Sequence, residues 1–264
     1  MTSAPCAAWV MTTSAMRVAL QPSYVLHSRP YRDTSALLEV FTAEQGRISL
    51  VARGARRKTR GGSGGALLQP FNPLLLSFSG RAELKNLGAT ESAGRPRQLR
   101  GQRLFSGLYL NELLVRLLHR HDPHPQLFAA YGATLDALAG SEPVDDILRQ
   151  FEFTLLGELG YGFSLDVDGL SGAAVLPDHW YHYHPDWGLV ARDAGADPAQ
   201  PAFAGTELLA MAAGGFGGQA RGTAKRLLRQ VLAVHLGEAP LRSRELFRTR
   251  STGERTAAAG GDQA

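Results

Sequence analysis

The stretch SALLEVFTAEQGRISLVARGA, residues 35–55, contains two apolar runs on either side of the turn-forming triplet Glu44-Gln45-Gly46. In the second run, apolar side chains occupy every second position from Ile48 to Ala52, which is the period of a half-buried β-strand. The stretch therefore predicts two short strands joined by a turn.

Three further runs of the same kind surround this stretch, at residues 17–29, 66–80 and 82–92. They are rich in Val, Leu and Phe, and turn signals such as Ser79-Gly80 and the glycines of residues 61–65 separate them. Five short strands without an intervening helix predict a small barrel, and the OB-fold is the five-stranded candidate.

The periodicity changes after the segment Gly94-Arg95-Pro96. Leucines from Leu110 to Leu118 follow the i, i+3, i+4, i+7, i+8 spacing of an amphipathic helix. Further helices are predicted over about 126–139, from near Pro143 to Gly160, and over about 221–236. A hairpin is expected over residues 179–192.

These patterns predict an α+β fold, in which an N-terminal five-stranded OB-fold β-barrel precedes a mostly α-helical C-terminal domain. The expected boundaries are a disordered extension over 1–16, the barrel over 17–93, the helical domain over 94–250 with an irregular, hairpin-containing insert at 164–206, and a disordered tail over 251–264. Met1, Met11 and Met16 are alternative starts of the chain.

The composition excludes several classes of protein. With 264 residues, 44% of them hydrophobic, the chain is long enough to bury a core. The single cysteine, Cys6, excludes a disulfide framework and a cysteine-based zinc site. No apolar run is long enough to span a membrane, and the first 16 residues lack the Lys or Arg of a signal peptide. We therefore expect a cytoplasmic protein.

The basic residues are dominated by arginine and are clustered. The net charge is only +4, but 25 of the 28 basic residues are arginines. A GC-rich genome and selection for phosphate recognition both explain this bias. The segments Gln45–Ala82 and Ser92–Asn111 contain basic residues and no acid, and the predicted helix at 221–236 carries a further basic face. These clusters predict a phosphate-binding surface, whereas the competing interpretation is a set of solvated loops and faces.

Catalytic signals are weak. The segment Gly61–Gly65 matches G-x-S-x-G around Ser63, but a nucleophile elbow requires a strand before the serine and a helix after it. His182 and His184 would share one face of a strand as a possible metal pair, although a surface role is the simpler interpretation. We expect no catalytic residue, metal or cofactor, and a Ser- or metal-dependent hydrolase is the alternative.

Seven sequence blocks carry a further signal, namely Tyr24–Ser35, Gln45–Arg47, Val51–Arg56, Leu68–Phe71, Gly107–Leu113, Phe151–Gly162 and Leu241–Phe247. No single block is diagnostic, but together they cover residues from about 17 to 250. Taken in order, the blocks resemble the RecO family of bacterial DNA repair proteins.

The resemblance implies a recombination mediator of the RecF pathway that acts on DNA damage, associated with the nucleoid. Such a protein binds single- and double-stranded DNA, anneals complementary strands, binds the acidic C-terminal tail of single-stranded DNA-binding protein (SSB), and works with RecR to load RecA. Some family members carry four zinc-binding cysteines in the region that matches 164–190, and none is present here. An RNA-binding OB-fold protein is the alternative suggested by charge alone.

Two sets of candidate residues follow from the charge pattern and the resemblance together. The predicted phosphate contacts are the cations of the barrel, namely Arg29, Arg53, Arg56, Arg57, Lys58 and Arg60. An acidic peptide that ends in an apolar residue requires a hydrophobic pocket rimmed by cations. For this pocket we predict Arg149, Phe151, Lys225 and Arg226.

Overall fold

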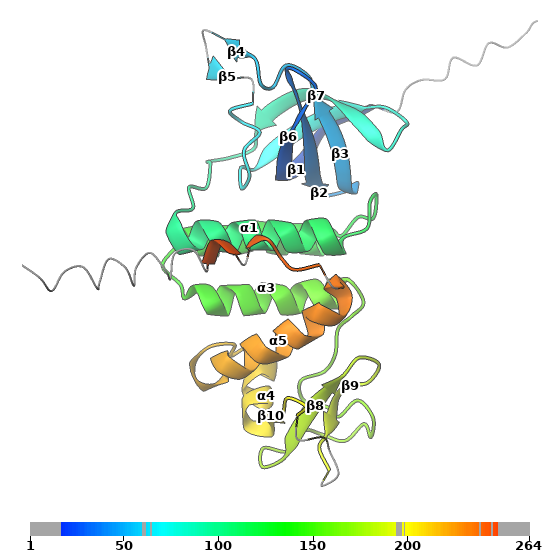
Figure 1. Ribbon diagram of the computed structural model, residues 1–264, viewed down its shortest axis with the longest axis vertical. Coiled ribbons are helices and arrows are strands. Elements are labelled where there is room, and N and C mark those ends of the chain that lie inside the picture. Colours follow the sequence, from blue (N-terminus) through cyan, green and yellow to red (C-terminus); the bar gives the residue numbers. More distant parts are fainter. Residues whose placement is uncertain are drawn as a thin grey trace, which may run out of the picture.

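The computed structural model, shown in Figure 1, describes residues 17–59, 62–63, 65–193, 197, 199–237, 239–243 and 245–247, without the side chains of 58–59 and 62–63. The predicted disordered segments, 1–16 and 251–264, therefore lie outside the described residues. Arg60 lies outside them as well.

The N-terminal part is a closed five-stranded barrel, which confirms the predicted fold class. Its strands are β1 (Arg17–Tyr31), β2 (Ser35–Thr42), β3 (Gly46–Ala52), β6 (Leu74–Ser79) and β7 (Leu84–Ser92), and they close in the order β1-β2-β3-β7-β6. The β3–β7 pair is parallel and all other pairs are antiparallel. Between β3 and β6, where the sequence predicts a loop, β4 (Lys58–Thr59) and β5 (Gly62–Ser63) form a short antiparallel ribbon.

Strands β2 and β3 and the middle of β1 are buried on both faces, which the alternating pattern does not predict. Val25, Leu38 and Ile48 belong to a cluster inside the barrel, whereas Tyr24 and Phe41 belong to the core formed with the helices. Residues on the second face are buried because the helices cover that side of β1 and β2. The barrel and the helical part therefore share one continuous hydrophobic interface.

The helical part confirms the predicted helices with small shifts at their ends. Its helices are α1 (Gly101–Leu117), α2 (Pro125–Ala139), α3 (Val144–Glu158), α4 (Gly205–Ala212), the 3₁₀ turn η1 (Gly218–Ala220) and α5 (Arg221–Leu236). Pro143 precedes α3 instead of opening it, and α3 ends before Gly160, which adopts a positive φ of 79°. Helix α4 is the one α-helix of the described residues for which the sequence analysis made no prediction, and its first two residues fall in the segment that was expected to be irregular.

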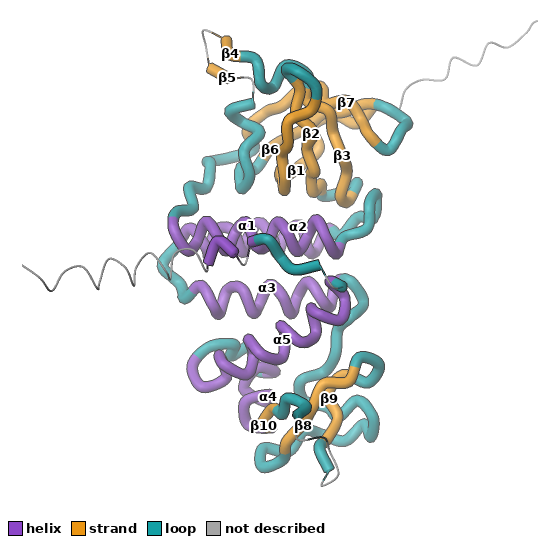
Figure 2. Tube along the Cα trace, in the orientation of Figure 1, coloured by secondary structure: helices purple, strands orange, loops and turns teal. Residues whose placement is uncertain are grey.

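The predicted hairpin is present at the far end of the helical part. Strands β8 (Trp180–His184) and β9 (Gly188–Ala191) pair, and β10 (Phe203–Ala204) adds to β8. Figures 1 and 2 show the resulting order along the molecule: the barrel, then α1 with α2, then α3, then α5, and finally α4 with the small sheet. The barrel and the hairpin therefore lie at opposite ends.

Polar contacts fix the barrel to the helices. The side-chain amide of Asn111, on α1, donates to the carbonyl oxygen of Leu26 at 2.9 Å, and the hydroxyl of Tyr131, on α2, donates to Asn111. Burial raises the pKa of Tyr131 far above its usual value, so this phenol stays protonated. The interface is thus packed, and buried hydrogen bonds join the barrel to α1 and α1 to α2.

Candidate functional site

One end of the barrel gathers most of the cations that the sequence predicts as phosphate contacts. The turn after β1 and the segment after β3 meet there, because Ala36 pairs with Ala52 and the amide of Arg56 donates to the carbonyl of Thr34 at 3.0 Å. This end lies away from α1, beside the β4–β5 ribbon (Figure 1). The described arginine side chains exposed at this end are Arg29, Arg32, Arg53, Arg56 and Arg57.

We call this set of five arginines the basic barrel end. Arg53 is oriented by a hydrogen bond from its Nη2 to Oδ1 of Asn86 at 3.1 Å, and Arg32 lies over the ring of Tyr31. Asp33 lies in the same turn and is the acid nearest in sequence to these arginines. Lys58 is in β4, but its side chain is not among those described. Exposed guanidinium groups that converge on one surface can bind successive phosphates.

Not every arginine of the acid-free segments belongs to a binding surface. In the segment 92–111, Arg97 makes a bidentate ion pair with Asp136 and Arg103 donates to carbonyl oxygens of residues 137, 138 and 142. The hydrogen bonds to Asp136 raise the pKa of Arg97 and lower that of Asp136. The interpretation of this segment as part of a phosphate-binding surface is therefore wrong for these two arginines, which hold α1, α2 and the barrel together.

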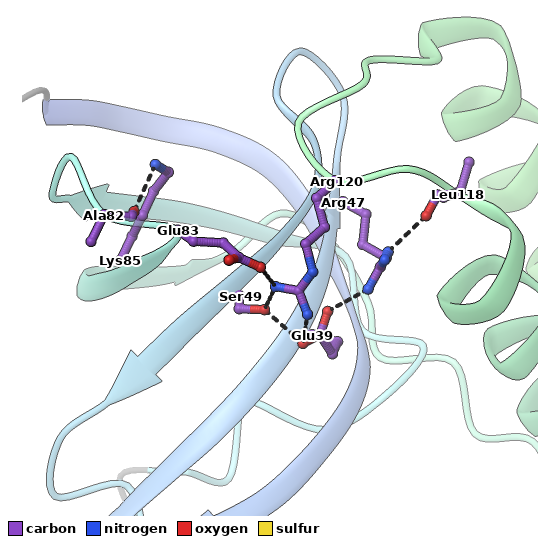
Figure 3. A network of polar contacts seen from close by, with 8 residues as sticks. All are labelled: Glu39, Arg47, Ser49, Ala82, Glu83, Lys85, Leu118 and Arg120. Atoms are coloured by element: carbon purple, nitrogen blue, oxygen red, sulfur yellow. Dashed lines mark hydrogen bonds and ion pairs between the residues drawn. The ribbon is translucent and has the colours of Figure 1, made fainter.

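Arg47 likewise serves the interface between barrel and helices. Its Nη1 donates to Oε2 of Glu39 at 2.9 Å and its Nε donates to the carbonyl of Leu118 at 3.1 Å. Figure 3 shows that Arg120, from the loop after α1, reaches the same glutamate and also contacts Ser49 and Glu83. The glutamate side chain is only 15% exposed, so its two arginines compensate a largely buried charge.

A second candidate site is a pocket of about 400 Å³ between α1, α3 and α5. Its described lining residues are Gln102, Ser106, Tyr109, Asp145, Leu148, Arg149, Lys225, Arg229 and Phe247. Three cations thus face one carboxylate, beside the apolar and aromatic surface of Leu148, Tyr109 and Phe247. We call it the cationic pocket.

A buried polar network underlies the cationic pocket. Arg149 is 7% exposed, and its Nη1 donates to Oε2 of Glu152 at 2.6 Å. The hydroxyl of Tyr109 donates to Oε1 of the same glutamate at 2.6 Å. Among the described residues, Nε of Arg149 has no hydrogen-bond partner, although it is buried. The pocket therefore contains a fixed guanidinium with unused donor capacity, which suits a carboxylate ligand.

The structure brings together only part of the residue set predicted for this pocket. Arg149 and Lys225 line it, whereas Phe151 is 2% exposed and packs in the core against Tyr131. Arg226 is directed elsewhere, because it donates to Thr223 and lies over the ring of Phe203. The prediction that Phe151 and Arg226 line this pocket is therefore wrong.

Sequence reasoning missed Tyr109, Arg229 and Phe247 as lining residues. Arg229 was detectable, because it follows Lys225 by one helical turn on the predicted basic face. Tyr109 and Phe247 belong to segments far apart in the chain, which only tertiary packing brings to one pocket.

The histidines and Ser63 are the residues that the sequence offers for metal binding or catalysis, and the side chain of Ser63 is not among those described. The described residues contain no group of three or more His, Cys, Asp or Glu side chains that could hold a metal. His182 and His184 occupy alternate positions of β8, and Ser63 lies in a two-residue strand. His119, His121 and His124 lie in or at the end of the loop after α1, where burial and Lys85 lower the pKa of His121. Within the described part of the chain, no helix is long and apolar enough to cross a membrane.

Comparison with known proteins gives a consistent result over the whole described chain. Residues 16–94 match the family model "Recombination protein O N terminal", and residues 98–245 match "Recombination protein O C terminal". The chain is 52% identical to a DNA repair protein RecO of Pseudomonas paraeruginosa over 90% of its length and 98% of the relative. It is 48% identical to the DNA repair protein RecO of Methylococcus capsulatus over 89% of its length and 95% of the relative.

Proposed function

Since the chain belongs to the RecO family of DNA repair proteins, we propose that it is a non-catalytic recombination mediator that binds single- and double-stranded DNA. The observation that carries this proposal is the basic barrel end, where the end of β1, the turn after it and the segment after β3 bring five exposed arginines to one end of the barrel. An exposed arginine surface neutralises backbone phosphates without reading sequence, which suits a protein that must act on any damaged site.

The second part of the proposal is that the cationic pocket binds the C-terminal tail of SSB. That tail is acidic and ends in an apolar residue with a free carboxylate. Arg149, held by Glu152, offers donors to the terminal carboxylate, while Leu148 and Phe247 offer apolar contacts. Lys225 and Arg229 lie on the exposed side of α5 and suit the acidic residues that precede the terminus.

The two surfaces together explain how such a mediator acts. One binds DNA and the other binds the protein that coats single strands, so the chain can bring complementary strands together for annealing. In the cell we expect it to work with RecR to load RecA, in the cytoplasm and on the nucleoid. The packed and hydrogen-bonded contact between barrel and helices joins the two parts that carry these surfaces.

The DNA-binding proposal is tested by measuring single-stranded DNA affinity against salt concentration. The triple variant Arg53→Ala/Arg56→Ala/Arg57→Ala should flatten the slope of log K against log[salt] by about 2 and weaken binding at least about tenfold at low salt. The control removes three exposed arginines of the helical part, at Arg100, Arg221 and Arg242. Equal losses in the two triple variants would contradict a localised DNA site.

The SSB proposal is tested with a labelled SSB C-terminal peptide. We expect Lys225→Ala/Arg229→Ala to weaken binding by about tenfold or more, since two charge-assisted contacts are lost. Arg226→Gln, on the same helix but directed toward Phe203, is the matched control and should bind the peptide normally. If only Arg226→Gln weakens binding, the cationic pocket is not the site.

A further inference from the structure

The hairpin at the far end of the molecule has one buried face and one open face. Tyr181 and Tyr183 are buried, and Tyr183 packs against Phe163 with ring centroids 5.3 Å apart. Trp180, His182 and His184 alternate with these tyrosines and therefore point to the opposite side of β8. The outer side of β8 therefore does not pack on the core of the helical part.

Large apolar side chains are exposed on and beside this outer side. Trp180 is 54% exposed, Trp187 51% and Leu170 60%. Two neighbouring hollows of about 630 and 430 Å³, which share Asp193 in their linings, lie against Trp180 and Trp187 respectively. Two exposed indoles beside surface hollows are typical of an interaction surface, because tryptophan contributes large binding energies when a partner covers it.

The charges around these indoles disfavour a phosphate ligand. Residues 161–206 contain six aspartates and one arginine. The side chains of Asp178 and Asp186, at the two ends of β8, are 83% and 82% exposed. The one arginine, Arg192, donates to the carbonyl of Asp197. This end of the molecule therefore has the opposite charge from the basic barrel end, and we expect it to bind cations in preference to phosphates.

Each of the two exposed carboxylates lies against a histidine ring: Oδ1 of Asp178 is 2.9 Å from Nδ1 of His179, and Oδ2 of Asp186 is 4.0 Å from Nδ1 of His184. Carboxylates beside exposed aromatic rings are a combination that binds organic cations. The rings of His184 and Trp187 are 6.5 Å apart, and Asp186 lies between them in the chain. An indole face attracts a guanidinium or ammonium group, and a nearby carboxylate adds a charge-assisted hydrogen bond. In addition, Nδ1 of His182 is buried without a hydrogen-bond partner among the described residues, in the lining of the smaller hollow.

We propose that the hairpin face, defined by Leu170, Trp180, His182, His184 and Trp187, docks a basic segment of a protein partner. Arginine or lysine side chains of that segment stack on Trp180 and Trp187 and pair with Asp178 and Asp186. Leu170 covers the aliphatic part of one such side chain. This surface is separate from the basic barrel end and from the cationic pocket, both of which select anions.

The test uses the full chain and a fluorescein-labelled peptide of six Arg-Gly repeats, with binding followed by fluorescence anisotropy. We expect Trp187→Ala and Asp186→Asn each to weaken binding by about tenfold, with a strong salt dependence. Two of the three tryptophans of the chain, Trp180 and Trp187, lie on the hairpin face, so the unlabelled peptide should also quench intrinsic fluorescence. Val234→Ala and Glu142→Gln, at exposed positions elsewhere, are the matched controls and should bind as the unmodified chain does.

Three results would overturn the proposal. The first is unchanged peptide affinity in both hairpin variants, which would place the peptide elsewhere on the chain. The second is equal binding of a Glu-Gly repeat peptide. The third is a loss of single-stranded DNA binding in Trp187→Ala, which would make the hairpin face a base-stacking surface. Circular dichroism checks that each variant is folded. If Trp187→Ala does not fold, Asp186→Asn still tests the proposal.

Discussion

The Nη1 atom of Arg149 lies 2.6 Å from Oε2 of Glu152, one turn further along α3, and the glutamate carboxylate has no exposed surface. Tyr109, from α1, donates to the other carboxylate oxygen. The cationic pocket is therefore built on a buried ion pair, and the orientation of its main arginine depends on a residue that does not line the pocket.

Glu152→Gln should destabilise the protein by about 3 kcal/mol, because Arg149 is then left as a buried charge without a counter-ion. Urea unfolding measures this loss. Adding Arg149→Met to the same chain should recover part of the stability, because the buried charge is removed. If the loss of unfolding free energy in the double variant equals the sum of the losses in Glu152→Gln and Arg149→Met alone, the two side chains do not interact.

Gly46→Ala should be among the most damaging single changes in the barrel. Gly46 has a φ of +64°, and a Cβ atom there would lie 2.1 Å from the carbonyl oxygen of Asp122. We expect a loss of more than about 2 kcal/mol, since backbone atoms of the loop after α1 would have to move. Gly54→Ala is the control, with a φ of +69° and nothing within 4 Å of the new Cβ; its cost should be only about 1 kcal/mol. If thermal unfolding shows similar losses of stability for Gly46→Ala and Gly54→Ala, the backbone at Asp122 moves away from the new Cβ atom at little cost.

Glu39→Gln should weaken the junction between barrel and helices. Arg47 and Arg120 both pair with Glu39, and its loss removes the carboxylate that Arg47 contacts and leaves Arg120 with the exposed Glu83. We expect the unfolding free energy, measured with urea, to fall by about 2 kcal/mol. Hydrogen exchange over residues 118–124 should become faster. Glu83→Gln removes a 67% exposed partner of Arg120 and should cost less than about 0.5 kcal/mol. If Glu83→Gln costs as much as Glu39→Gln, burial does not set the strength of this network.

Acid should release the C-terminal segment from α1. Burial opposes ionisation of Glu112, but hydrogen bonds from Ser243 and the amide of Arg242 outweigh it and lower the pKa of Glu112. Because the pKa is lower in the folded state, the stabilisation is complete above the unfolded-state value of 4.5 and is lost as the pH falls through the folded-state value. Unfolding free energies measured from about pH 6 to pH 3 should fall less steeply for Glu112→Gln than for the unmodified chain. Parallel curves would exclude this carboxylate as a contributor.

The barrel and its helices could be predicted because their signals are local. Alternation in residues 35–55 and the leucine spacing from Leu110 to Leu118 reflect the geometry of one strand or one helix at a time. Helix α4 was missed because its eight residues follow an irregular segment and offer too few turns for a clear period. Ser49 is buried although the alternating pattern placed it on an open face, because Arg120, from the loop after α1, lies against it and donates to its hydroxyl.

The sequence by itself determined the order of the elements, the family and the segments that carry positive charge. Only the tertiary structure decided which cations are available to bind a ligand. Arg47, Arg97 and Arg103 are held by carboxylates and carbonyl oxygens of distant segments, whereas Arg53 and Arg56 stay exposed at the barrel end. The tertiary structure also places Lys225 and Arg229 in the cationic pocket and Arg226 outside its lining. The reason is that a helix turns 100° per residue, so neighbouring side chains on α5 meet different parts of the protein. The sequence shows which residues are charged, but folding decides which counter-ion or carbonyl oxygen lies near each of them.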